Sequence, residues 1–119
     1  MNQRQQELLA RVEQAMDPYV TCSPKDLTVS LHIPPQATHQ IIAIGVQEER
    51  IVRLDKDVLT LPKHLLALRK HIDSLTPRFT VADFRRASAL PRSIVPAVLD
   101  WFDTQGITQR EGDYRIVIG

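Results

Sequence analysis

The sequence predicts a mostly helical α+β protein built from two similar small domains, because a pattern of roughly 60 residues, the size of a small domain, occurs twice. The segment Ser23–Leu27 is matched by Thr80–Phe84, and each copy ends in two short apolar–polar runs around a polar turn. Ile51–Leu54 then aligns with Ile107–Arg110, which indicates a one-residue slip before the final hairpin. We therefore expect one domain over residues 1–61 and a second over residues 62–119.

In the first copy, the pattern predicts three helices and then a hairpin. An apolar stripe at helical intervals predicts a helix over residues 3–16. Ser23 as an N-cap, with Pro24 at the first helical position, predicts a short helix over residues 24–31. A third helix over about residues 35–49 should bury Ile41, Ile42, Ile44 and Val46, and the alternating runs 51–54 and 58–61 should form a β-hairpin.

The second copy follows the same plan. An apolar stripe at helical intervals predicts a helix over residues 63–74. Thr80 with Asp83 resembles a capping box for a short helix that buries Phe84. The next helix is expected to start near Pro91 or Ser93. Because proline beyond the first turn of a helix costs about 3 kcal/mol, Pro96 favours Ser93 as the N-cap of an unkinked helix. Residues 107–110 and 114–118 predict a hairpin that turns at Gly112. A helix, a helix-turn-helix and a two-stranded wing make a winged helix, here in tandem.

Composition narrows the class of protein. Apolar residues make up 43% of the 119 residues, yet no apolar run approaches the roughly 20 residues of a membrane span. The N-terminus does not have the pattern of a signal peptide, and the single cysteine, Cys22, is typical of a reducing cytoplasm. We expect a soluble, cytoplasmic monomer without a metal site, because the histidines and acidic residues do not have ligand spacing.

The charges are unevenly divided between the copies. Residues 1–61 hold six Lys/Arg and eight Asp/Glu, whereas residues 62–119 hold nine and six. From Arg78 onward all six cations are arginine, whose planar fork pairs with phosphate and stacks on bases. The second copy is therefore the better candidate for a polyanion partner.

The motifs of the second copy resemble a known family. Four segments are similar to the C-terminal end of the bacterial selenocysteine-specific elongation factor, SelB: Phe79–Arg85, Pro91–Pro96, Leu99–Asp103 and Gly106–Asp113. The resemblance implies two winged-helix domains that recognise the selenocysteine insertion (SECIS) hairpin of a messenger RNA and tether the factor for UGA recoding. It also implies that GTPase activity, the ribosome and selenocysteyl-tRNA belong to other parts of the factor. The chain has no phosphate-binding loop, so we expect neither enzyme activity nor a cofactor here.

The expected RNA contacts lie in the second copy, while residues 1–61 orient it. A-form RNA has a major groove too narrow for a helix, so recognition should use a helix N-terminus and a wing against loop nucleotides and backbone. Lys25, Arg50, Arg53 and Lys56 are candidates for an auxiliary backbone contact by the first copy. The predicted RNA-binding residues are Arg85, Arg86, Arg92, Ser93, Gln109, Arg110, Tyr114 and Arg115, of which Arg110 and Arg115 are preferred on the wing.

Two other functions remain open from the sequence. A DNA-binding tandem winged-helix regulator would use the same helix in a DNA major groove. A protein-interaction scaffold would suit the acidic first copy. Asp100 and Asp103 are expected to lie on a solvated helix face rather than form a catalytic pair.

Overall fold

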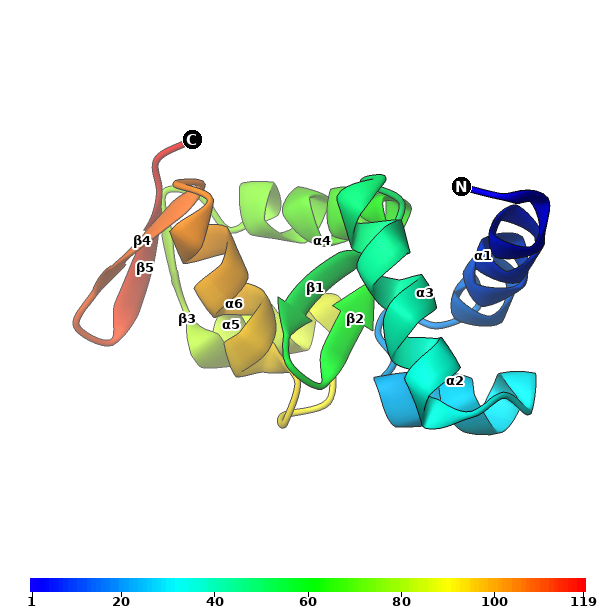
Figure 1. Ribbon diagram of the computed structural model, residues 1–119. Helices are drawn as coiled ribbons and strands as arrows, with labels where there is room; N and C mark the ends of the chain where they lie inside the picture. The colour runs from blue at the N-terminus through cyan, green and yellow to red at the C-terminus, as the bar shows by residue number, and fades with distance from the viewer. The chain divides into compact units, whose positions relative to one another are not determined.

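The computed structural model describes residues 1–119, which divide into two compact units, Met1–His64 and Leu65–Gly119. The first unit contains three helices and a hairpin (Figure 1). These elements are α1 (Gln3–Met16), α2 (Pro24–Leu31), α3 (Pro35–Gln47), β1 (Val52–Asp55) and β2 (Val58–Thr60). The other elements are α4 (Pro62–Ser74), β3 (Arg78–Thr80), α5 (Val81–Ser88), α6 (Val95–Thr104), β4 (Thr108–Glu111) and β5 (Tyr114–Val117). The predicted α+β winged-helix class is confirmed.

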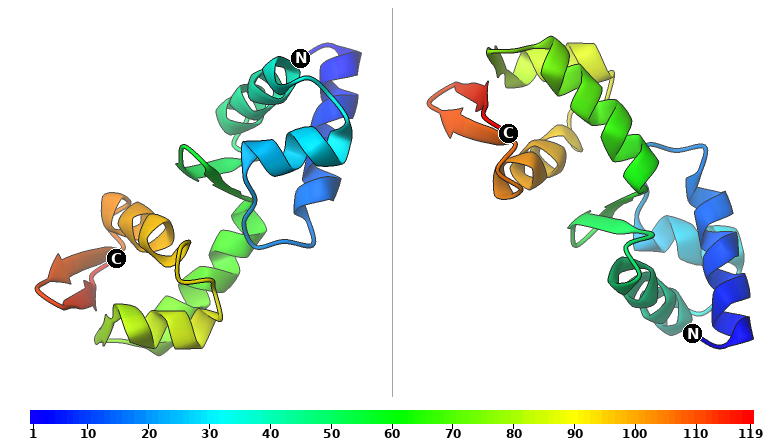
Figure 2. Two further views of the ribbon diagram at one scale, coloured as in Figure 1. Left: turned by 90° about the horizontal axis from the view of Figure 1, so that it is seen from below. Right: turned by 90° about the horizontal axis from the view of Figure 1, so that it is seen from above.

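Each unit has its own apolar core. In the first unit, α1, α2 and α3 cross one another and bury Leu9, Leu27 and Ile42 almost completely (Figure 2). In the second, Ile72, Phe84 and Phe102 are similarly buried, and the Phe79 and Phe84 rings pack with centroids 6.2 Å apart. No helix is both long enough and apolar enough to cross a membrane. Because the helices of each unit share one core, the hairpin can project from them. The β4–β5 ribbon does so from the helices of the second unit in Figure 2.

The two units share local backbone features at matching sequence positions. Ser23 and Thr80 each cap a short helix, as predicted. Each takes part in a complete capping box with the acid that follows it in the first turn, although the box was predicted only at Thr80. Those two helices both end in a left-handed residue, His32 with φ 55° and Ala89 with φ 58°, which align with each other in the repeat. Such conformations are uncommon for residues other than glycine. Their repetition strongly supports duplication of one fold.

The one-residue slip between the copies lies inside the hairpin, not before it. Arg53 faces Leu59 across the first hairpin, and Arg110 faces Arg115 across the second, so the alignment set by the capping boxes still holds at Arg53 and Arg110. In the first hairpin the register shifts between Arg53 and Asp55. The extra residue there is accommodated as a β-bulge. The predicted match of Ile51 with Ile107 was therefore wrong by one position, and Ile51 corresponds to Thr108.

The sheet of the second unit has a third strand that the sequence did not predict. The strand β3 pairs antiparallel with β5, which gives the order β3-β5-β4. The first unit has only an isolated bridge at the matching place, where Cys22 and Leu59 exchange backbone hydrogen bonds of 2.9 and 2.8 Å. The strand β3 is too short to show a period, and its pairing partners lie beyond α5 and α6 in the sequence.

Helix α6 starts later than predicted. Its N-cap is Ile94 rather than Ser93, and Pro96 occupies the second helical position. The matching helix α3 starts at Pro35, which aligns with Arg92 in the repeat, and it has His39 where α6 has Pro96. Because proline lacks an N–H and clashes with the preceding turn, α6 cannot extend back to Arg92 without distortion.

The third helix of the first unit also differs in detail from the prediction. It ends at Gln47, Val46 is 37% exposed, and the buried residue of that turn is Gly45. A Cβ on Gly45 would lie 2.5 Å from the Cδ1 atom of Ile51. The second unit has buried Phe102 and Thr108 at these two positions. A large residue on the helix is thus matched by a small one on the following strand, which keeps the core volume filled in both units.

Candidate nucleic-acid interface

A short turn carries Arg92 and Ser93 in front of helix α6. Ile94 donates a backbone hydrogen bond to the carbonyl of Pro91 at 3.0 Å, which closes the turn, and both Arg92 and Ser93 are exposed. The N-cap supplies no side-chain acceptor, so the positive end of the helix dipole faces this turn. Pro96 removes one of the N–H groups that an anion would otherwise meet. The turn therefore offers a guanidinium and a hydroxyl beside a helix N-terminus.

The strand register divides the wing residues between two faces of the sheet. Gln109 lies opposite Ile116, which lies opposite Arg78 on the other side. One residue along, Arg110 faces Arg115, which in turn faces Phe79. Successive side chains point to opposite faces of a sheet. One face therefore carries Gln109, and the other carries Arg110 on the side of buried Phe79.

The outer face of the wing carries an exposed aromatic group. Tyr114 is 40% exposed, and the Arg78 guanidinium lies 4.4 Å from the centre of its ring. A cation above an aromatic ring is attracted by the ring quadrupole. Gln109 is on this same face of the sheet. Arg78 was counted among the cations but not among the predicted RNA-binding residues, because its strand was missed; its position beside Tyr114 adds it to the candidate site.

Arg110 lies at the edge of a hollow of about 270 Å³ on the other face of the wing. Residues Thr80–Ala82 at the start of α5 line the opposite side of the hollow, and Gly112 and Asp113 lie at the turn. The Arg110 Nε atom donates a 3.4 Å hydrogen bond to the carbonyl of Gly112, which curves the guanidinium over the turn. The hydrogen bond leaves the other guanidinium donors free for a ligand.

Arg115 is a correction to the predicted site. Its side chain is only 8% exposed, and its guanidinium bonds to both carboxylate oxygens of Asp103 at 3.1 and 3.2 Å and to Asp100 at 3.3 Å. Asp103 also accepts a 2.6 Å hydrogen bond from Thr108. With its donors held inside the unit, Arg115 is structural. Asp103 is correspondingly not part of a merely solvated face, although Asp100 is 72% exposed.

The two arginines of helix α5 differ in availability. Arg86 is exposed and forms an i,i+3 ion pair with Asp83 at 2.7 Å, while Arg85 is half-buried and forms no ion pair within 4.0 Å. Hydrogen bonds from the backbone and side chain of Thr80 lower the pKa of Asp83 below its ordinary value, and Arg86 adds to this effect. The capping box and Arg86 thus share one carboxylate.

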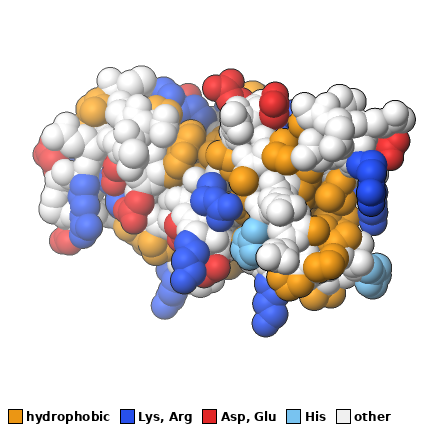
Figure 3. All heavy atoms as spheres, viewed as in Figure 1, with side chains coloured by type: hydrophobic (Ala, Val, Ile, Leu, Met, Phe, Trp, Pro, Cys, Tyr) orange, Lys and Arg blue, Asp and Glu red, His pale blue; other side chains and the backbone are white.

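The four cations of the first unit that were suggested as auxiliary contacts fall into two groups. Arg50 is paired with Glu13, whereas Lys25, Arg53 and Lys56 line one hollow. On the face shown in Figure 3, basic side chains lie among acidic and apolar groups. Recognition of a polyanion would therefore depend on positioned arginines and lysines.

The cysteine of the first unit has no nucleophilic character. Burial, with a smaller contribution from Asp26, raises the pKa of the Cys22 thiol to about 11. The thiol is therefore protonated at neutral pH, and the thiolate is the form that reacts. Cys22 contributes to the structure through its backbone bridge to Leu59.

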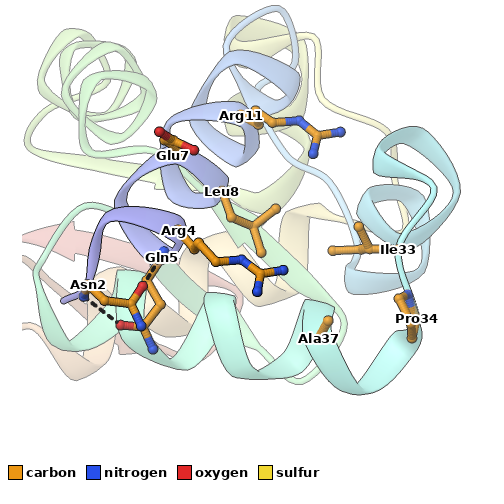
Figure 4. Close-up of a pocket in the computed structure, with 9 residues that line it drawn as sticks. All are labelled: Asn2, Arg4, Gln5, Glu7, Leu8, Arg11, Ile33, Pro34 and Ala37. Carbon is orange, nitrogen blue, oxygen red and sulfur yellow. Dashed lines mark hydrogen bonds between the residues drawn. The ribbon is translucent and has the colours of Figure 1, made fainter.

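A separate groove of about 570 Å³ lies between α1 and the start of α3 (Figure 4). Leu8, Ile33 and Ala37 give it an apolar lining, and the side chains of Arg4 and Arg11 reach over it. Arg11 donates a 3.2 Å hydrogen bond to the carbonyl of Leu31, which fixes it against the end of α2. The lining of the groove therefore mixes apolar and charged side chains.

Together these features define a class: a winged-helix protein with exposed arginines at the start of α6 and on the wing. Residues 70–117 match the family model described as the winged helix of elongation factor SelB, which confirms the resemblance over the second unit. Sequence comparison with curated proteins gave no match.

Two solved structures share the fold over 99% of the chain. The mRNA-binding domain of elongation factor SelB from E. coli, in complex with SECIS RNA, has a TM-score of 0.84 and 20% identity and is covered over its whole length. The bacterial selenocysteine-specific elongation factor EF-Sec has a TM-score of 0.78 and 18% identity, and the chain covers 19% of it. The fold of the entire chain is thus that of the mRNA-binding domain of SelB.

Proposed function

We propose that this chain is the messenger-RNA-binding module of a selenocysteine-specific elongation factor and recognises a SECIS hairpin. The observation that carries the proposal is the whole-chain likeness to the SelB domain whose structure was solved with SECIS RNA. The family match over residues 70–117 supports it independently, because it arises from the sequence of the second unit. The module itself is a binding protein, and GTP hydrolysis, the ribosome and selenocysteyl-tRNA are assigned to the remainder of such a factor.

In this proposal, the second unit makes the contacts with RNA. Arg92 and Ser93 would hold a phosphate at the start of α6, where the helix dipole adds to the positive charge. Arg110 would bind backbone at the hollow beside α5. On the outer face of the wing, Arg78 and Tyr114 form a pair on which an extruded loop base can stack. Arg85, Arg86 and Gln109 would add backbone or edge contacts, and Arg115 would hold the wing in place without touching RNA.

The test is the salt dependence of hairpin binding by the full chain. Arg92→Ala and Arg110→Ala should each weaken binding roughly tenfold and reduce the slope of log K against log salt by about 0.7 to 0.9. Lys70→Ala removes an exposed cation of α4 and serves as the matched control, with less than about a twofold effect. Unchanged affinity and slope for both arginine variants would remove the turn and the wing from the interface.

Competition separates the alternatives. A tandem winged-helix DNA regulator would bind duplex DNA more tightly than an RNA hairpin, because B-form DNA admits a helix to its major groove and A-form RNA does not. The groove beneath Arg4 and Arg11 favours a second candidate function, protein interaction by the first unit. Failure to bind either nucleic acid at low salt would favour that function.

A further inference from the structure

The groove between α1 and the start of α3 has an apolar floor that is open to solvent. Leu8, Ile33 and Ala37 line it, and each of them is only half-buried by the rest of the first unit. The volume of the groove is about 570 Å³. An apolar cavity of about 150 Å³ already accepts a benzene-sized group, so this groove has room for more than one apolar side chain of a partner.

Two exposed arginines of α1 lie over this apolar floor. Arg4 and Arg11 are on one stripe of the helix, two turns or roughly 10 Å apart, with Leu8 between them. Figure 4 shows both side chains reaching over the groove toward the side of Ile33. Neither arginine forms an ion pair within 4.0 Å. Arg11 bonds the carbonyl of Leu31 through one nitrogen, so its other donors remain free for a ligand.

The acidic residue of the lining does not neutralise the two arginines. Glu7 points away from both guanidinium groups in Figure 4 and accepts a 3.3 Å hydrogen bond from Gln3. Residues 1–61 carry two more acidic than basic residues, but salt screens exposed charges beyond roughly 8 Å under physiological conditions. The local potential over the groove is therefore set mainly by Arg4 and Arg11, and it favours a negatively charged partner.

We propose that this groove binds an acidic amphipathic helix of a partner protein. Apolar side chains on one face of that helix cover Leu8, Ile33 and Ala37. Carboxylates two turns apart along the edge of the same face pair with Arg4 and Arg11, whose spacing they match. A phosphodiester is the poorer ligand, because a charge buried against an apolar floor loses hydration without gaining hydrogen bonds from the floor. The inference goes beyond RNA recognition by the second unit and uses none of its residues.

The experiment measures binding of the full chain to a synthetic helical peptide that has leucines on one face and two glutamates, two turns apart, beside them. Arg4→Gln combined with Arg11→Gln should weaken binding roughly tenfold or more, because two charge-assisted pairs are lost. Added salt should weaken the wild-type complex more than that of the double variant. Ala37→Phe fills the groove without changing the charge, so it should weaken binding at every salt concentration. The same peptide with glutamine in place of glutamate should bind wild type about as weakly as the acidic peptide binds the double variant.

Arg53→Gln combined with Lys56→Gln is the matched control, because it removes two exposed cations without ion pairs from the same unit, outside this groove. It should change the affinity for the peptide less than about twofold. Amide chemical shifts in ¹H–¹⁵N spectra should change at residues 4–11 and 33–37 when the peptide is added. The inference is overturned if wild type does not bind the acidic peptide, if the shifts change only elsewhere, or if the double variant loses affinity for an RNA hairpin and not for the peptide. Failure of wild type to bind any RNA hairpin would contradict the proposed function alone.

Discussion

The two units bury side chains of opposite chemistry at the same position of the second hairpin strand. Leu59 in the first unit is fully buried and apolar, whereas the matching residue of the second unit is Arg115, also buried but charged. Asp103, which neutralises it, takes the place of Val46 on the preceding helix. In the second unit, a polar network of an arginine, two aspartates and a threonine therefore stands where the first unit has a buried leucine.

The difference shows that arginine content alone is a poor guide to function. The two wing arginines of the second unit lie opposite each other on adjacent strands, yet Arg110 is exposed and Arg115 is held inside the unit. The network also fixes β5 to α6, and β5 carries Tyr114. A structural arginine can thus support the functional surface that an exposed arginine forms.

The largest expected effect comes from replacing Arg115 by leucine, the residue that the first unit has at the matching position. Arg115→Leu should lower the free energy of unfolding of the second unit by roughly 3 kcal/mol, because Asp103, whose side chain is 24% exposed, loses its counter-charge. The chain's single tryptophan, Trp101 on α6, reports the unfolding of this unit by fluorescence in urea.

Arg110→Leu is the control for that substitution, because the same charge is removed from an exposed residue of the adjacent strand. We expect a change within about 0.5 kcal/mol. Adding Asp103→Ala to Arg115→Leu should restore part of the lost stability, since the unpaired carboxylate is then absent. Equal stability of wild type and Arg115→Leu would show that the network is not structural.

Features that depend on neighbouring residues could be predicted from the sequence. Ser23 and Thr80 were identified as caps because a cap and its partner lie within one helical turn. The strand at Arg78–Thr80 and the burial of Arg115 depend on contacts made by distant parts of the chain, which periodicity does not encode. The repeat did contain a signal for the burial of Arg115. Arg115 aligns with Leu59, a hydrophobic core position, and the helix before it carries two aspartates that the first copy lacks.

The start of helix α6, compared with that of α3, is the second difference between the units, and Pro96 accounts for it. Pro96→Ala should allow α6 to extend back toward Arg92, as α3 extends to Pro35, with less than about 1 kcal/mol change in stability. Cα chemical shifts of residues 92–94 would report the new helical turn. The affinity of the chain for the RNA hairpin should fall, because Arg92 and Ser93 would leave the turn that presents them.

The converse substitution tests whether the proline alone determines the difference. His39→Pro places proline at the fifth residue of α3, where it should cost up to about 3 kcal/mol or shift the helix start to a later residue. Non-helical shifts at residues 92–94 in Pro96→Ala would mean that the turn before α6 is held by other contacts.

The smallest expected effect concerns the capping boxes and depends on pH. Thr80 hydrogen bonds lower the folded-state pKa of Asp83, so its contribution to stability is present above the ordinary value of 3.8 and is lost as the pH falls through the lower folded value. Wild type should therefore be more stable than Asp83→Asn at pH 6, and this difference should shrink steadily below about pH 4. Asp113→Asn, which removes an exposed carboxylate from the turn of the wing, is the matched control. A constant difference between wild type and Asp83→Asn across this range, followed by Trp101 fluorescence in urea, would mean that ionisation of Asp83 contributes nothing to the cap.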